Sequence, residues 1–312
     1  MARFIKNKPY EGELGFGRNV TTNARIMAPD GTFKVIRESG TNWQNVYFHL
    51  MTMSWKRFFA LFFLCFVLLN AFFALLYCAL GTGQFNGTTG DTWLERFSAA
   101  FFFSSQTLTT VGYGHISPAT LASSLLASFE SFVGLLTFAL ISGLLYGRFS
   151  RPNAKVVFSE TMVVAPYRDA QALMFRMGNT RRSELIEAEV QVIVTVNQLA
   201  ADGAMERRYF TLSLEYGKIS FFSMSWTVVH VLDEQSPLYG FSPEELIQNR
   251  AEFMVLLKAI EEANQQTVFT RHSYTADEIV WGAKFQPIMA RNAEGIPVVK
   301  MQHIGDYTPV QK

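Results

Sequence analysis

The sequence has few of the residues that build disulfide frameworks and metal centres. Its 312 residues include only two cysteines, Cys65 and Cys78, and five histidines. Both cysteines lie in one apolar run, thirteen positions apart. On a single helix that separation is too large for a disulfide. We therefore interpret both as packing residues and expect neither a disulfide nor a metal centre.

Motifs for nucleotide binding and catalysis are also missing. The chain has no Gly-rich phosphate loop, no nucleophile motif and no His or Cys residues at metal-ligand spacing. Charged residues make up only 17% of the chain and the net charge is +1. This balance argues against a nucleic-acid partner. We expect no catalysis and no cofactor.

Apolar residues, in contrast, are abundant and form long runs. Residues 58–80 carry no charge, and a helix of that length measures about 35 Å, enough to cross a bilayer core of about 30 Å. A second apolar run, from Leu121 to Gly147, contains one acid, Glu130. The sequence therefore predicts an outer helix over 58–80 and an inner helix over 119–148.

The segment between the two spans predicts a pore. Residues 92–108 are too interrupted by polar side chains for a third span, so we expect a re-entrant pore helix there. It leads directly into the filter sequence Thr110, Val111, Gly112, Tyr113 and Gly114. In four copies, this pattern lines potassium selectivity filters with its backbone carbonyls. We expect K⁺, as the permeant ion, at residues 110–113 of a pore domain spanning 57–150.

Gly112 and Gly114 have a specific role in that prediction. Carbonyls that all point at one axis require backbone angles that a Cβ would resist, and glycine has none. Glu130, near the outer end of the inner helix, is expected to support the filter or pore helix from behind, because acids inside membrane spans face protein or water.

Basic residues beside the spans predict the topology. Lys56 and Arg57 precede the first span, and Arg148, Arg151 and Lys155 follow the second. Because positive flanks stay inside, we expect a multi-pass cell-membrane protein with both termini in the cytoplasm. The first residues lack the apolar core of a cleavable signal peptide.

The flanking segments differ in character. Residues 1–42 are polar and are interpreted as a cytoplasmic N-terminal segment. Residues 43–56 are amphipathic, with tryptophans at both ends, and predict an interfacial slide helix. The alternative is that they simply continue the first span.

Beyond Pro152 the sequence changes to short runs in which apolar and polar residues alternate, a pattern that is typical of strands. The clearest is 185–196, and turn pairs such as Asp202-Gly203 separate others. Ser242-Pro243 with Glu245 predicts one short helix. Seven or more strands in about 150 residues predict a β-sandwich over 151–312.

Four further stretches resemble inward-rectifier potassium channels, closest to the prokaryotic branch. They are Phe132–Pro152, Phe175–Val190, Val228–Leu246 and His272–Pro287. The resemblance implies a homotetramer that conducts K⁺ passively, an immunoglobulin-like cytoplasmic sandwich that extends the pore, and a bacterial inner membrane. The expected fold is therefore a helical pore domain, with two spans and a re-entrant pore helix, followed by an all-β domain.

The resemblance places a gate on the inner helix. Tyr146 matches the family's bulky gate position, and Phe138, Ser142 and Tyr146 are spaced by four, so they share one helix face. The alternative is that this face packs on the outer helix. Gly134 and Gly143 are interpreted as hinges or as close-packing points.

The resemblance also assigns charged residues. Glu187 and Glu278 match acids that line the family's cytoplasmic pore, where they would concentrate cations; a solvated strand face is the alternative. A second set resembles the family's cluster for anionic phospholipid headgroups, although a positive-inside flank alone explains these residues as well. Its members are Lys56, Arg57, Arg148, Arg151, Lys155, Arg181 and Arg182.

Some positions depart from the family pattern. Phe138 stands where strong rectifiers have an acid, which puts steep block by internal Mg²⁺ or polyamines in doubt. Gln106 and Ile116 stand where the family has an acid–base pair across the filter. Gating by the cytoplasmic domain and by lipid remains the expectation. The rival hypothesis is a membrane-anchored binding domain with a non-conducting pore.

Overall fold

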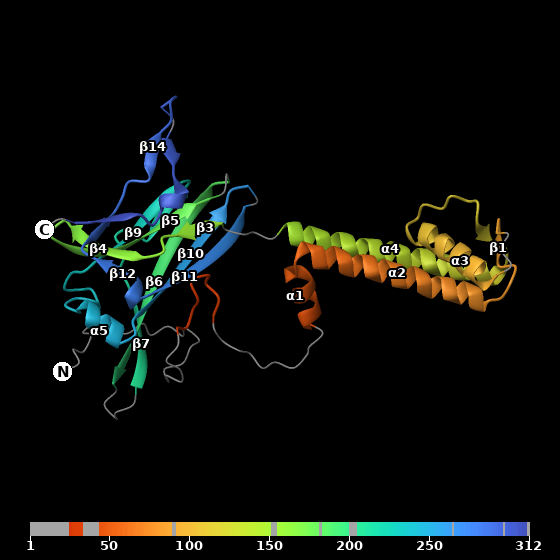
Figure 1. Ribbon diagram of the computed structural model, residues 1–312, viewed down its shortest axis with the longest axis horizontal. Coiled ribbons are helices and arrows are strands. Elements are labelled where there is room, and N and C mark those ends of the chain that lie inside the picture. Colours follow the sequence, from red (N-terminus) through yellow and green to blue (C-terminus); the bar gives the residue numbers. More distant parts are fainter. Residues whose placement is uncertain are drawn as a thin grey trace. The chain divides into compact units, whose positions relative to one another are not determined.

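The computed structural model describes residues 25–33, 44–88, 92–150, 155–180, 183–199, 205–263, 265–295 and 297–310. The chain divides into a helical unit within residues 38–151 and a β unit made of residues 1–37 and 152–312 (Figure 1). Each unit is described by itself. Of the segment 1–42, only residues 25–33 are described.

The helical unit contains four helices and one short strand pair. The helices are α1 (Gln44–Thr52), α2 (Trp55–Ala79), α3 (Trp93–Leu108) and α4 (Leu121–Phe149). β1 (Phe85–Asn86) pairs antiparallel with β2 (Ser117–Pro118). Both α2 and α4 are long and apolar enough to cross a membrane. The shorter α3 packs against both, around a core that includes Phe73, Tyr77 and Phe103.

Polar caps set where α3 and α4 begin. Thr92 and Glu95 form a reciprocal capping box at the start of α3, and Thr120 and Ser123 form one at the start of α4. Such caps satisfy backbone N–H groups that the first turn leaves unpaired. The inner helix therefore starts at residue 121 and not at residue 119.

The expected slide helix over 43–56 is shorter in the structure. α1 ends at Thr52, and Ser54 takes an extended conformation with φ −62° and ψ 150° as the cap of α2. Because this extended residue breaks the helix, Trp55 and Lys56 belong to the first turn of the outer helix, which begins three residues before the expected 58.

The β unit is a sandwich of two five-stranded sheets. One has the order β11-β10-β6-β7 with β8 also on β6, and the other has the order β12-β4-β5-β3 with β9 also on β5. Phe175, Val192, Phe253 and Leu257 belong to one buried cluster that both sheets share. The helical pore unit followed by a largely β domain confirms the predicted fold class. The immunoglobulin-like topology stays a prediction.

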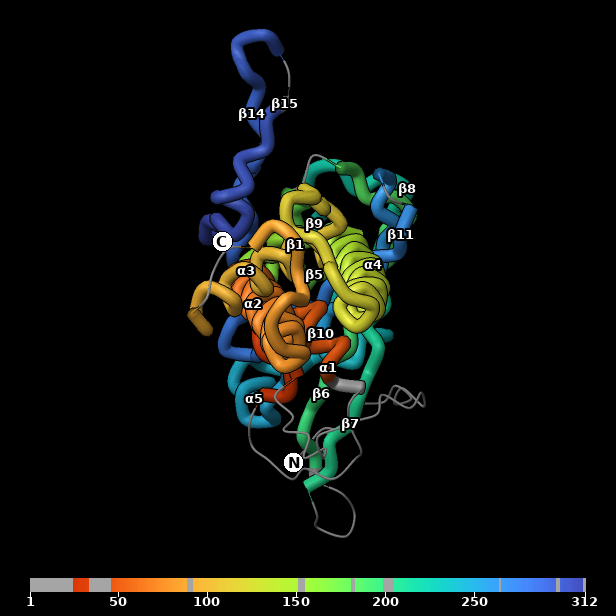
Figure 2. The backbone as a smooth tube through the Cα atoms, turned by 90° about the vertical axis from the view of Figure 1, so that its right-hand side faces the viewer, coloured from red at the N-terminus to blue at the C-terminus, as the bar shows by residue number. Residues whose placement is uncertain are grey.

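The strands of the β unit are β3 (Val156–Phe158), β4 (Met162–Tyr167), β5 (Ala170–Asn179), β6 (Leu185–Leu199), β7 (Met205–Thr211), β8 (Lys218–Phe222), β9 (Ser225–Val231), β10 (Glu252–Glu261), β11 (Gln266–Thr275), β12 (Ile279–Trp281), β13 (Ala283–Phe285), β14 (Met289–Arg291), β15 (Pro297–Val299) and β16 (Tyr307–Pro309). The short helix α5 spans Pro243–Gln248 and has the predicted Ser242–Glu245 capping box. The hairpin β14–β15 projects from the rest of the β unit (Figure 2).

The N-terminal residues 25–33 are held on the β unit by side chains. The Ile26 and Met27 N–H groups donate to the two carboxylate oxygens of Glu252, at 2.8 and 2.9 Å. Arg25 donates to Glu278 at 2.9 Å. Two backbone donors on one carboxylate fix the position of this segment.

Candidate ion-conduction site

The filter backbone alternates in handedness. Residues with positive φ recur at every second position: Thr110 at 63°, Gly112 at 53° and Gly114 at 84°. Alternation of left- and right-handed residues turns successive N–H groups to one side of the chain and the carbonyls to the other. The glycines at 112 and 114 meet this requirement without a Cβ clash.

Gln106 in the last turn of α3 binds the N–H side of the filter. Its backbone carbonyl accepts from the Val111 and Gly112 N–H groups at 2.8 and 3.2 Å. Its side-chain oxygen accepts from the Tyr113 N–H at 2.9 Å. Three consecutive N–H groups thus point toward the pore helix, and the carbonyls face away from it. In the sequence, Gln106 was noted only as a departure from the family pattern.

Residues 110–114 are all exposed in a single chain. Val111 is 52% exposed and Tyr113 is 77% exposed. Beside them lies an open cavity of about 370 Å³, whose lining includes Phe102, Thr109 and His115. Apolar and aromatic side chains at this density on a surface indicate an interaction face.

Behind the pore helix, Glu130 joins a buried polar cluster. Its two carboxylate oxygens accept from the Tyr77 hydroxyl, at 2.7 Å, and from the Ser104 hydroxyl. Ser104 also lies 3.0 Å from the Asn70 side-chain oxygen. Glu130, Ser104 and Asn70 are fully buried and Tyr77 is 1% exposed. The cluster links α2, α3 and α4, and only Glu130 was singled out in the sequence. The signal for Asn70 was a lone amide within an apolar run.

Gly134 lies beside this cluster and allows α4 to approach α3 closely. A Cβ at Gly134 would lie 2.4 Å from the Leu108 carbonyl oxygen, whereas a Cβ at Gly143 would meet nothing within 4 Å. These glycines were interpreted as hinges or as close-packing points, and the contacts of Gly134 are those of a close-packing point. No neighbour within the described residues explains Gly143.

The face of α4 with the expected gate residues is exposed. Phe138 is 72% exposed, Tyr146 is 75% exposed, and Ser142 between them is also exposed. α2 therefore leaves this face uncovered within one chain, contrary to the alternative in which it packs on the outer helix.

Arg148 differs from the role expected of it as a lipid-binding residue. Its guanidinium donates to the Met53 carbonyl at 2.6 Å and to the Leu50 carbonyl. It also lies over the rings of Trp55 and Phe58, with centroid distances of 4.5 and 4.4 Å. The Arg148 guanidinium is thus bound by groups of the protein itself. Lys56, Arg57 and Lys155 are exposed. Arg151, Arg181 and Arg182 lie outside the described residues.

The two predicted pore acids each have a cationic partner. Glu187 lies at a bulge in β6 with φ 51°, and its carboxylate pairs with Lys218. The hydrogen bond that the Lys218 amine donates to Glu187 raises the pKa of this amine. Glu278 accepts from Arg25, and from the Thr275 N–H at 2.9 Å. A paired acid contributes less negative field than a free one.

The sequence matches known families over most of its length. Residues 156–312 match the family described as "Inward rectifier potassium channel C-terminal domain", and residues 62–150 match the family described as "Ion channel".

Three curated relatives extend that match. Inward rectifier potassium channel Kirbac3.1 of Paramagnetospirillum magnetotacticum is 36% identical over 274 residues, covering 87% of this chain and 91% of that protein. Inward rectifier potassium channel 18 of Homo sapiens is 31% identical, covering 63% of this chain and 47% of that protein. ATP-sensitive inward rectifier potassium channel 12 of Gallus gallus is 29% identical, covering 75% of this chain and 59% of that protein.

Proposed function

The chain belongs to the inward rectifier potassium channel family, and from this we propose that four copies form a passive potassium pore around residues 110–114. The protein is an ion channel in a membrane, not an enzyme. The proposal concerns the filter residues, the tetramer, the gate and the lipid partners.

The observation that carries this proposal is the one-sided filter backbone. Gln106 binds three N–H groups on one side, residues 110–114 are exposed in one chain, and we propose that their carbonyls face the pore axis. A single strand of carbonyls cannot replace the hydration shell of K⁺, but four strands around one axis can. The uncovered filter face of one copy supports assembly around such an axis.

In the proposed mechanism, ions lose water stepwise and advance by mutual repulsion. α3 ends at Leu108, directly before the filter, so the negative end of its dipole favours a cation there. The cluster of Asn70, Tyr77, Ser104 and Glu130 holds α3 in place from behind.

The gate is proposed at the exposed α4 face of Phe138, Ser142 and Tyr146, where four aromatic rings would narrow the pore. The β unit and anionic lipid would control it, the latter through Lys56, Arg57 and the basic residues after α4. Internal Mg²⁺ and polyamines are proposed as weak blockers. The basic flanks support cytoplasmic termini, and we propose a bacterial inner membrane as the location.

Potassium flux into liposomes tests this function. The full chain should give a barium-sensitive K⁺ signal and migrate as a tetramer after cross-linking in the membrane. A membrane-anchored binding domain with a closed, non-conducting pore would give no barium-sensitive flux. That result, from protein shown to be folded and membrane-inserted, would replace our proposal with the rival hypothesis.

A further inference from the structure

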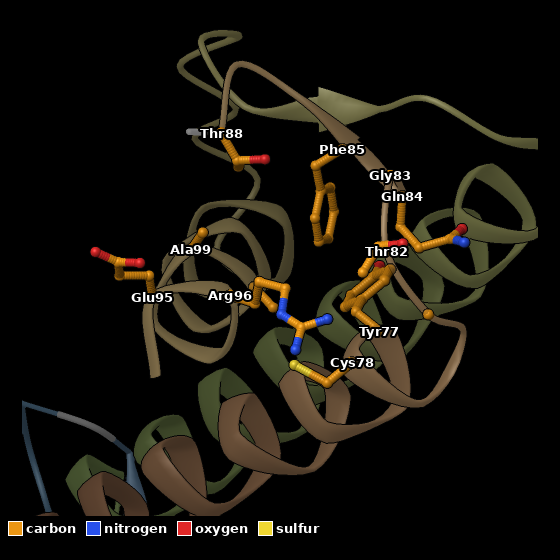
Figure 3. A pocket seen from close by; sticks show the side chains of 12 residues that line it. Tyr77, Cys78, Thr82, Gly83, Gln84, Phe85, Thr88, Glu95, Arg96 and Ala99 are labelled. Carbon is orange, nitrogen blue, oxygen red and sulfur yellow. The ribbon is translucent and has the colours of Figure 1, made fainter. Parts of the chain in front are cut away.

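A cavity lies where the outer end of α2 meets the start of α3, away from the filter. Its volume is about 290 Å³. Tyr77 and Cys78 of α2 line one side, Arg96 and Ala99 of α3 line another, and the loop of residues 81–85 closes it (Figure 3). We call this space the Arg96 cavity.

One guanidinium nitrogen beside the Arg96 cavity lacks a partner among the described residues. The Nε of Arg96 is buried and makes no hydrogen bond to any described residue. Figure 3 shows the Arg96 side chain extending from α3 toward Cys78 and Thr82. Buried polar groups in folded proteins are nearly always paired, so an unpaired guanidinium nitrogen beside a cavity indicates a missing anion.

The described part of the helical unit offers no free carboxylate to supply that anion. Its acids are Glu95 and Glu130. Glu95 also lines the cavity, but it caps α3, accepting from the Thr92 N–H at 3.1 Å and its hydroxyl at 2.8 Å, and it points away from Arg96 in Figure 3. Glu130 is buried in its cluster with Tyr77 and Ser104. The described part of the helical unit in a second copy would bring the same two engaged acids.

The position of the cavity favours a lipid as the source of the anion. α2 has 25 residues, so it extends about 37 Å and its last turn reaches the headgroup layer of a bilayer with a core of about 30 Å. Cys78 lies in that last turn. Phospholipid phosphates lie at this depth, and a guanidinium binds a phosphate through two parallel hydrogen bonds.

We propose that the Arg96 cavity binds the phosphodiester headgroup of an anionic phospholipid, on the membrane face that carries the filter loop. Arg96 is the cationic partner, and the Thr82 and Thr88 hydroxyls, which also line the cavity, are available to donate to the remaining phosphate oxygens. This site is separate from the basic residues that flank α1 and the end of α4.

Cys78 provides a local reporter for this site. The chain has two free cysteines, so Cys65→Ser leaves Cys78 as the single thiol, on the wall of the cavity. The full-length protein is reconstituted into vesicles of phosphatidylcholine alone or mixed with phosphatidylglycerol. The rate of Cys78 modification by the uncharged reagent methyl methanethiosulfonate is then measured.

We expect phosphatidylglycerol to slow this modification about tenfold when Arg96 is present, in line with the strength of a charge-assisted hydrogen-bond pair. Arg96→Gln should abolish the protection. Arg96→Lys keeps the charge but loses the paired donors of the guanidinium, so it should retain part of the protection. Arg168→Gln, an exposed arginine of the β unit, is the matched control and should be protected like the parent.

The remaining outcomes contradict the proposal. Equal protection in Arg96→Gln would show that the lipid acts elsewhere. Equal protection by inorganic phosphate in phosphatidylcholine vesicles would replace the lipid with a free ion. A Cys78 that is unreactive in both vesicles would mean that a second copy covers the cavity.

Discussion

At the scale of single residues, backbone conformation matters most in the filter. Gly112 and Gly114 have positive φ as expected of glycine, but Thr110 shares this conformation at 63° although it carries a Cβ. That strain costs about 1–2 kcal/mol. The glycine positions were predictable from the sequence. The Thr110 conformation and the role of Gln106 were not, because they depend on where α3 ends relative to the strand.

Gly112→Ala tests the backbone requirement. Gly112 has φ 53°, so a Cβ there adds about 1–2 kcal/mol of strain in each of four copies. We expect barium-sensitive K⁺ flux to fall by at least about tenfold while the tetramer persists. Gly217→Ala is the control, since its Cβ would meet only the Val190 carbonyl oxygen at 3.7 Å. Normal flux in Gly112→Ala would be inconsistent with a carbonyl filter at this strand.

Lys218→Gln tests the electrostatics of Glu187. The lysine pairs with this proposed pore acid, so its removal leaves four acids unpaired around the pore axis and raises local cation concentration. Block by internal spermine should then occur at several-fold lower concentration. Lys284→Gln, at the exposed middle position of β13, serves as control. If spermine sensitivity does not change, Glu187 lies on a solvated strand face and not along the pore.

At the scale of elements, buried polar contacts fix the helices and strands that position the filter. α3 packs into an apolar core through Ala100, Phe103 and Leu108, and the Glu130 cluster also joins it to α2 and α4. The sequence located each helix to within a few residues because apolar runs and capping residues are local signals. It could not pair Glu130 with Tyr77 and Ser104, since these contacts depend on helix rotation and crossing.

Glu130→Gln tests whether this cluster positions the filter. A side-chain amide presents an NH₂ group to the Tyr77 or Ser104 hydroxyl, leaving a donor poorly satisfied at a cost of about 1–3 kcal/mol. We expect a lower melting temperature of the tetramer and, in the channels that remain folded, a higher ratio of sodium to potassium permeability. Destabilisation with unchanged selectivity would reduce the cluster to a structural role.

His272 on β11 predicts an acid sensitivity of the β unit. Its ring stacks on Phe158 of β3, with centroids 4.6 Å apart, and burial lowers its pKa to about 4 from the usual 6.5, despite a hydrogen bond to the Pro29 backbone. Between these two pH values the unfolded chain binds a proton that the folded chain excludes. Stability is therefore full above about pH 6.5 and declines as the pH falls toward 4.

Thermal unfolding of the full-length protein at pH 7.5 and pH 5 measures this effect. Because of His272, the free energy of unfolding of the parent protein should fall by roughly 1–2 kcal/mol between pH 7.5 and pH 5. His272→Phe keeps the stack on Phe158 but does not titrate, so the fall in its free energy of unfolding should be smaller. His230, whose pKa burial also lowers, remains as the source of residual sensitivity. An identical acid response in both proteins would show that His272 is not the titrating group.

At the scale of the whole molecule, the division into a pore unit and a β unit was predictable because the two parts have different periodicities. Long apolar runs predicted α2 and α4, and alternating runs predicted the sandwich. Within the sandwich, β3 and β4 are separate strands that pair with different parts of β5, and residues 159–161 lie between them in the chain. The sequence could not show how copies assemble, and in our proposal the exposed filter face of one chain becomes a pore only through its partners.

The reversal potential of the purified channel in a planar bilayer, with K⁺ on one side and Na⁺ on the other, tests the central claim most directly. If four copies surround the ions with the carbonyls of residues 110–114, the current should reverse at a potential that corresponds to a potassium preference of about a hundredfold or more. A reversal potential near zero, with barium-sensitive current present, would contradict the carbonyl filter on which the proposed function rests.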